Sequence, residues 1–205
     1  TSIKIPNSVS EIPTTDFCAF QGCKKLTNIT VDEGNASYCS IDGILYSKDK
    51  KTLLCCPGGK SGKVDIPNTV EYMDIISFNG CAELTAITIP DSVEYLGGPT
   101  GGNFFGGTFY GCSGLTSITI PSSVQVVGMA AFANCNNLTN VIISNGATEI
   151  DEWAFNNCPS LSNVILKGKV NKIGPEAFDS IKSDYSITFT VPSGTKAYYE
   201  GLLNS

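Results

Sequence analysis

The chain repeats itself along most of its length. The segment GCAELTAITIPDSV at residues 80–93 returns as GCSGLTSITIPSSV at residues 111–124. Regularly spaced phenylalanines precede such segments: Phe78, Phe109, Phe132, Phe155 and Phe178, the last four at equal intervals. A unit this short cannot bury its own apolar face, whereas stacked copies can. The repetition therefore predicts a solenoid of about seven or eight coils in which equivalent side chains lie above one another.

Each part of the unit A-F-x-x-C-x-x-L-x-x-I-x-I-P-x-x-V-x-x-I-G has a structural interpretation. The I-x-I step alternates with period two, as a short strand does, and the following proline ends that strand because it cannot donate to a ladder. The V-x-x-I step predicts a second short extended piece on another wall, and the glycine allows a tight corner. The A-F-x-x-C step suits one helical turn whose Phe and Cys point into the coil.

The period lies within the 20–29 residues expected of leucine-rich repeats, and L-x-x-I-x-I matches their strand core. The full pattern resembles the BspA-like leucine-rich repeat family, whose members are surface proteins of gut and oral bacteria and some protists. The resemblance implies a right-handed parallel superhelix, mainly β with short helical turns. We expect residues 1–205 to form a single solenoid that is a fragment of a longer protein, with a C-terminal capping coil at 175–205.

Two insertions near residues 32–63 and 97–107 break the period. In the first, Ile44–Tyr46 and Thr52–Cys56 flank the polar SKDKK, which predicts a hairpin; its second arm could join the main sheet or not. The second is the glycine-rich GGPTGGNFFGG, which predicts a loop. Phe104 and Phe105 at its centre are a candidate ligand anchor, or else pack back on the neighbouring coil.

Nine cysteines are present, and five follow the repeat phenylalanines: Cys23, Cys81, Cys112, Cys135 and Cys158. We expect these five to form an inward ladder of reduced, buried thiols, because stacked parallel side chains poorly suit the disulfide torsion. A Cys18–Cys39 or Cys39–Cys55 bridge stays open. Without histidine or a C-x-x-C pair, the sequence predicts no metal site.

The composition narrows the class of function. The net charge of −6 argues against nucleic acid as the partner, and no apolar run is long enough to insert into a membrane. The absence of histidine excludes Ser–His and Cys–His catalysis. A pair of carboxylates could still hydrolyse sugars. However, the pattern places most acids, including Glu11, Glu71, Glu94 and Glu149, at outward positions spread along the solenoid. We therefore expect no enzyme and no cofactor.

The outward position between the two apolar residues of each strand is the candidate binding column. It contains Thr30, Thr88, Thr119, Ile142 and Ile165. Threonine suits any exposed sheet position; alternatively, the column is a flat platform for a partner. Together with the family resemblance, it implies a monomeric, non-enzymatic binding or adhesion module, secreted or on a cell surface, that contacts a host or bacterial surface protein or glycan. The alternatives are a structural spacer that carries other domains and a carbohydrate-active enzyme that uses carboxylates alone.

Overall fold

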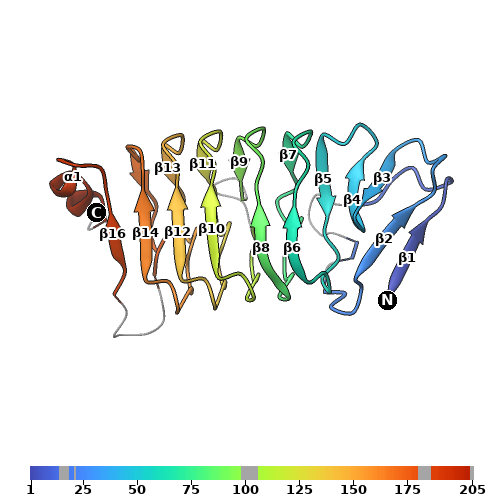
Figure 1. Cartoon of the computed structure of the whole chain (residues 1–205), viewed down its shortest axis with the longest axis horizontal. Coiled ribbons are helices and arrows are strands. Elements are labelled where there is room, and N and C mark those ends of the chain that lie inside the picture. Colours follow the sequence, from blue (N-terminus) through green and yellow to red (C-terminus); the bar gives the residue numbers. More distant parts are fainter. Residues whose placement is uncertain (14–18, 21, 98–105, 180–185, 204–205) are drawn as a thin grey trace.

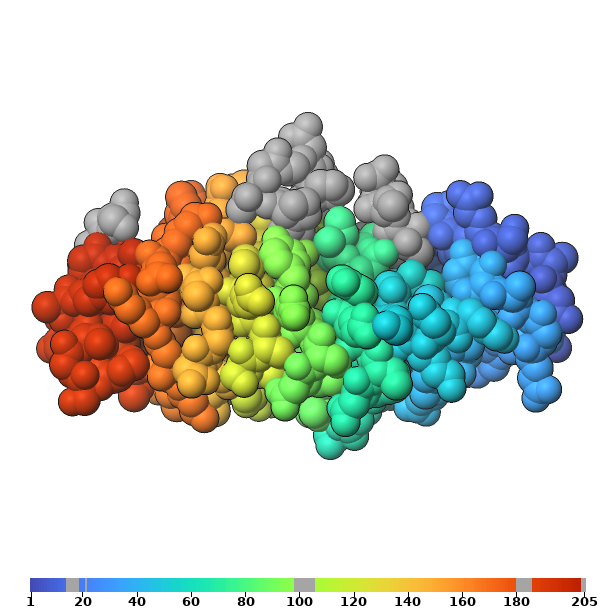
Figure 2. All heavy atoms as spheres, turned by 90° about the horizontal axis from the view of Figure 1, so that it is seen from above, coloured from blue at the N-terminus to red at the C-terminus, as the bar shows by residue number. Residues whose placement is uncertain are grey.

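The chain folds into an elongated solenoid of about seven turns. The computed structural model describes residues 1–13, 19–20, 22–97, 106–179 and 186–203. In the space-filling view the sequence runs in order along the long axis (Figure 2). Each coil therefore contacts mainly its sequence neighbours, as the stacking argument requires.

The first wall consists of the I-x-I strands, which pair in parallel and mostly in register. These strands are β1 (Ser2–Ile5), β2 (Asn28–Val31), β6 (Gly62–Asp65), β8 (Leu84–Thr88), β10 (Ser117–Ile120), β12 (Asn140–Ile143), β14 (Asn163–Leu166) and β16 (Thr188–Thr190) (Figure 1). They form three separate sheets, β1-β2, β6-β8 and β10-β12-β14-β16. In the largest sheet Ile118 pairs with Val141, and Val141 with Val164. All three are buried, so the inward apolar positions stack as predicted.

The second wall consists of the V-x-x-I steps, each of which contributes two residues. Its strands are β7 (Tyr72–Met73), β9 (Tyr95–Leu96), β11 (Val126–Val127), β13 (Glu149–Ile150) and β15 (Lys172–Ile173). Strands β9, β11, β13 and β15 form one parallel ladder, whereas β7 pairs with β5 of the inserted hairpin.

The coil that contains β8 and β9 is paired differently on the two walls. On the first wall β8 pairs with β6 of the preceding coil, and on the second wall β9 pairs with β11 of the following coil. Neither β8 with β10 nor β7 with β9 forms a ladder among the described strands. This coil is therefore offset. It leaves a gap between β8 and β10 on the first wall and a gap between β7 and β9 on the second wall.

The phenylalanine segments form the third wall as successive hydrogen-bonded turns, in place of the single helical turn expected from the sequence. Ala130 and Asn134, two residues before and after Phe132, have φ of 52° and 60°, which interrupts a right-handed helix. The Phe132 N–H instead donates to the Ala154 carbonyl oxygen of the next coil at 2.7 Å. The turns thus form a backbone ladder of their own.

Five rings stack along this third wall, which confirms the central expectation from the repeat. Successive centroids from Phe78 through Phe109, Phe132 and Phe155 to Phe178 lie 5.1, 4.9, 5.2 and 5.2 Å apart. The planes of Phe132 and Phe155 differ by only 4°. The first four rings are fully buried.

The thiol ladder is confirmed for four of its five expected members. Cys81, Cys112, Cys135 and Cys158 are reduced and buried. The Cys135 thiol donates to the Phe109 carbonyl oxygen of the preceding coil at 3.3 Å, and Cys112 and Cys158 make the equivalent bond at 3.2 Å. Burial raises the pKa of the Cys112 thiol well above its ordinary value, so this thiol is a neutral packing residue.

The expectation for Cys23 was wrong, and the question left open for Cys39 has an answer. Cys23 is exposed rather than inward, because it lines an open surface depression together with Ile3 and Phe20. Cys39 is a free thiol, whereas Cys55 is disulfide-bonded. Neither bridge considered for Cys39 therefore forms.

The first insertion contains the predicted hairpin. Strand β3 (Tyr38–Ile41) pairs antiparallel with β4 (Ile44–Ser47), and β4 with β5 (Thr52–Cys55). The arm β5 joins the second wall through β7. Just beyond β5, the Cys56 N–H donates to the Ser77 carbonyl oxygen at 2.7 Å. The insertion thus occupies the place of a missing coil between the turns of Phe20 and Phe78.

The last described coil is followed by the short helix α1 (Lys196–Leu203). Its Tyr199 is buried, donates from its hydroxyl to the Gly168 carbonyl oxygen at 2.7 Å and accepts from the Val170 N–H at 2.9 Å. These bonds fix the helix on the edge of the solenoid.

Candidate functional site

The predicted binding column faces solvent on the first wall. Thr119, Ile142 and Ile165 lie side by side in register on β10, β12 and β14. The threonine is exposed and both isoleucines are half-buried, because successive residues of a strand point to opposite faces. The structure therefore brings three of the candidate residues together as one strip.

The remaining candidates do not extend this strip directly. Thr88 lies on β8, which is separated from β10 by the gap in the first wall. Thr30 is in the β1-β2 sheet, where its hydroxyl donates to the Ile3 carbonyl oxygen at 3.2 Å. Phe104 and Phe105 lie outside the described residues.

The gap between β8 and β10 is a groove of about 460 Å³ that we call the threonine groove. Thr88 lines one side and Thr119 the other, with Ile87 and Ser117 between them in the lining. Ile87 occupies an inward repeat position but is only half-buried, because no strand covers it on that side. The strip and the threonine groove thus form a continuous surface with both hydroxyl and aliphatic contacts.

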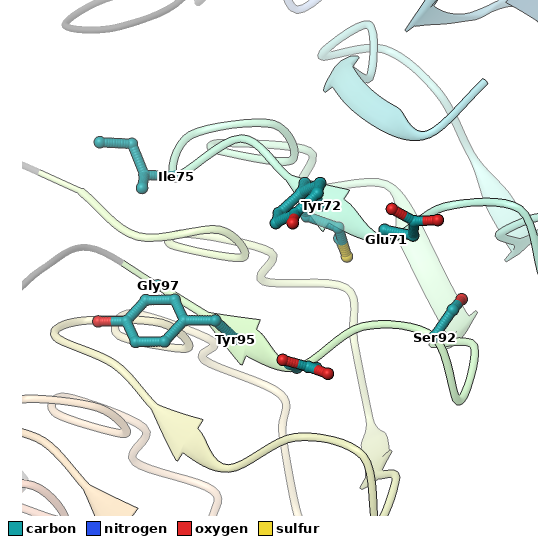
Figure 3. Close-up of a pocket in the computed structure, with 8 residues that line it drawn as sticks. Glu71, Tyr72, Ile75, Ser92, Tyr95 and Gly97 are labelled. Carbon is teal, nitrogen blue, oxygen red and sulfur yellow. The ribbon is translucent and has the colours of Figure 1, made fainter. Parts of the chain in front are cut away.

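The sequence analysis missed a second groove, which lies between β7 and β9 in the gap of the second wall (Figure 3). It has a volume of about 300 Å³, and we call it the tyrosine groove. Its lining residues are Glu71, Tyr72, Met73, Ile75, Ser92, Glu94, Tyr95 and Gly97. The signal was present in the sequence: Glu-Tyr occurs twice at the same outward repeat position, in successive copies of the unit.

The expectation that the acidic residues would not converge was wrong for one pair. Glu71 and Glu94 line the same groove, since the β7 and β9 coils are adjacent. Glu71 accepts a 2.8 Å ion pair from Lys51, and this interaction raises the pKa of the lysine. Glu149, by contrast, lies farther along the second wall, 3.3 Å from Lys172.

Metal and membrane sites are not found in the described part of the chain. No group of three Cys, Asp or Glu side chains there is arranged to hold a metal ion. Within the same ranges, no helix has the length and hydropathy needed to cross a bilayer.

Comparison with known families identifies the repeat. The profile described as the BspA type leucine rich repeat region matches six copies in this chain, over residues 1–43, 56–100 and 105–201. No curated protein sequence gives a significant match.

Three bacterial structures share the fold over nearly the whole chain. A leucine-rich cell surface protein of Faecalibacterium prausnitzii is 30% identical, with a TM-score of 0.80 over 98% of this chain and 50% of its own. The pneumococcal vaccine antigen PcpA is 23% identical, with a TM-score of 0.72 over 99% of this chain and 53% of its own. A leucine-rich repeat protein of Eubacterium ventriosum is 23% identical, with a TM-score of 0.62 over 90% and 60%. The chain spans about half the length of the first two.

Proposed function

Because the chain belongs to the BspA-type leucine-rich repeat family, we propose that it is a non-enzymatic binding module exposed on a cell surface or secreted. Its partner is a surface protein or glycan of a host or of another bacterium. The similar Faecalibacterium prausnitzii chain is described as a cell surface protein, which supports the location.

One observation supports binding over a purely structural role. The strip of Thr119, Ile142 and Ile165 is in register, and its Thr119 lines the threonine groove. Two aliphatic side chains on the outer face of a solenoid are not needed for coil stacking, since only the inward positions contact the next coil's core. Aliphatic patches with a polar rim are typical of interaction surfaces.

The alternatives have less support. A structural spacer would need no groove in its walls, whereas the offset coil leaves one groove in each of the two walls. A carboxylate-only glycosidase requires a protonated acid beside a second carboxylate, whereas Glu71 of the tyrosine groove is in an ion pair with Lys51, and Glu149 and Asp151 both pair with Lys172.

The test is an array of glycans and host matrix proteins probed with the wild-type chain and with the double variant Ile142→Asp/Ile165→Asp. We expect the variant to lose binding, since two charges would be desolvated in the interface. The matched control is Gln125→Asp/Asn171→Asp, which adds the same charge at exposed positions beside β11 and β15. Equal signals from all three proteins would refute the strip as the binding site.

Hydrolysis of nitrophenyl glycosides by the same preparations tests the enzyme alternative. We expect no release of nitrophenol above the rate in buffer. Release that is abolished by Glu94→Gln would replace the binding module with a glycosidase.

A further inference from the structure

The tyrosine groove has features that the repeat does not require. Tyr72 and Tyr95 are 66% and 40% exposed, respectively, and each presents a large aromatic ring to solvent. In the following coils the equivalent position is Val126, then Glu149 and then Lys172, all in register with Tyr95. Stacking therefore tolerates apolar, acidic and basic side chains at this position, and it does not require the pair of tyrosines.

The geometry of the groove places both rings at one opening. Tyr72 is on β7 and Tyr95 is on β9, and because these two strands do not pair, a depression remains between the coils (Figure 3). Met73 is buried and belongs to the lining. Gly97 ends the groove at φ of +97°, where a Cβ atom would lie 2.8 Å from the Gly128 backbone. The shape of the groove is therefore set by packed backbone and not only by exposed side chains.

The polar groups of the groove include carboxylates, which only accept hydrogen bonds, and the Tyr72 and Tyr95 hydroxyl groups, which donate and accept. Glu71 and Glu94 each contribute a carboxylate. The Ser92 hydroxyl donates to the Val70 carbonyl oxygen at 2.5 Å, so that its remaining lone pairs can only accept. Lys51 does not line the groove, but its ammonium group is bound to the lining residue Glu71 and can donate. A ligand with several hydroxyl groups and an apolar ring face would satisfy both the acceptors and the aromatic rings.

We propose that the tyrosine groove binds a pyranose unit that carries no acidic group. The C–H face of the sugar packs against the tyrosine rings, and its hydroxyl groups donate to Glu94 and Ser92. A volume of about 300 Å³ is at the small end of ligand pockets, which run from roughly 300 to 1,000 Å³, and suits a single ring unit. The inference rests on the proposed function in so far as a surface glycan supplies the sugar.

The charge of the groove selects among sugars. Burial raises the pKa of Tyr95, and the negative charges of Asp151 and Glu149 raise it further. The carboxylates of Glu71 and Glu94 themselves line the groove, so uronic and sialic acids would meet like charges there and are disfavoured. A lysine or arginine side chain from a protein partner is the other chemistry to consider. The Lys51 ammonium already bound at Glu71 would repel such a cation, whereas it can donate to a sugar oxygen.

The test is a saturation-transfer NMR titration of the whole chain with methyl glycosides of glucose, galactose, mannose and N-acetylglucosamine. Methyl glucuronide is the acidic probe, and Nα-acetyl-lysine methylamide is the cationic probe. We expect saturable binding of at least one neutral glycoside in the millimolar range, and weaker or no binding of the glucuronide. Binding of the lysine amide alone, equal binding of the glucuronide, or no binding of any neutral glycoside would overturn the proposal.

The variants Tyr72→Ala and Glu94→Gln locate the site. Both residues are exposed, so the fold should survive, which a circular dichroism melt verifies. We expect each variant to weaken glycoside binding at least about tenfold. Trp153→Ala is the matched control, because Trp153 is another exposed aromatic residue, 39% accessible, outside this groove. Unchanged binding in both groove variants would overturn the assignment.

Failure here is distinguishable from failure of the proposed function. The double variant Ile142→Asp/Ile165→Asp leaves the tyrosine groove intact and should bind the glycoside like wild type. Array binding that depends on the strip could persist even if every sugar titration fails.

Discussion

The phenylalanine stack makes the substitution Phe132→Ala the most direct test of the fold. Phe132 is fully buried, and its ring lies 4.9 Å from Phe109 and 5.2 Å from Phe155. A buried Phe→Ala change typically costs about 3–5 kcal/mol of unfolding free energy. Because two ring pairs worth about 0.5–1.5 kcal/mol each are lost together, we expect about 5 kcal/mol. A loss of this size is a large part of the about 5–15 kcal/mol that stabilises typical domains.

The matched control is Phe178→Ala at the end of the stack. Phe178 is only half-buried, with a stacked partner on one side and an edge contact with Phe189 at 5.1 Å. We expect its loss to cost about 2 kcal/mol. Urea unfolding followed by circular dichroism and by the fluorescence of Trp153, the single tryptophan, gives both values. Equal costs for the two variants would refute the view that each coil is stabilised by neighbours on both sides.

Three further predictions concern the thiols, a buried charge and the close approach of coils. The pKa of Cys112 is raised by burial above its ordinary value of 9.0, so the folded chain holds its proton where the unfolded chain releases it. Stability should be unchanged below about pH 9 and fall above it; urea midpoints at pH 7 and pH 10 test this, and a flat profile would contradict it. Lys172→Met removes the 2.9 Å bond to the buried Asp151 and should cost about 1.5–3 kcal/mol; a double-mutant cycle with Asp151→Asn that shows no coupling would count against it. Gly146→Ala would place a Cβ atom within van der Waals overlap of the Ser122 backbone and should lower the melting temperature. Gly201→Ala in α1 meets no neighbour and should raise it or leave it unchanged, so a reversed order would refute the argument.

The repeating part of the molecule follows from the printed sequence alone. A constant interval forces Phe109, Phe132 and Phe155 above one another, because each coil must return to the same point before the next begins. The same interval aligns the inward cysteines and places Ile142 beside Ile165 on the outer face. These features depend only on period and polarity, which can be read along the chain without coordinates.

The places where the ladders break depend instead on how whole coils pack. The coil of β8 and β9 pairs with the preceding coil on the first wall and with the following coil on the second. Which neighbour each strand pairs with depends on how the coil tilts against both neighbours. The interval from Tyr72 to Tyr95 equals the interval from Phe109 to Phe132, yet only the second step is closed. The longer interval across the insertion is open between Thr88 and Thr119 but paired between Tyr95 and Val126, so the spacing alone does not distinguish a paired step from an open one. The two grooves exist because backbone pairing is set by the packing of three coils together, and local sequence does not encode that tilt.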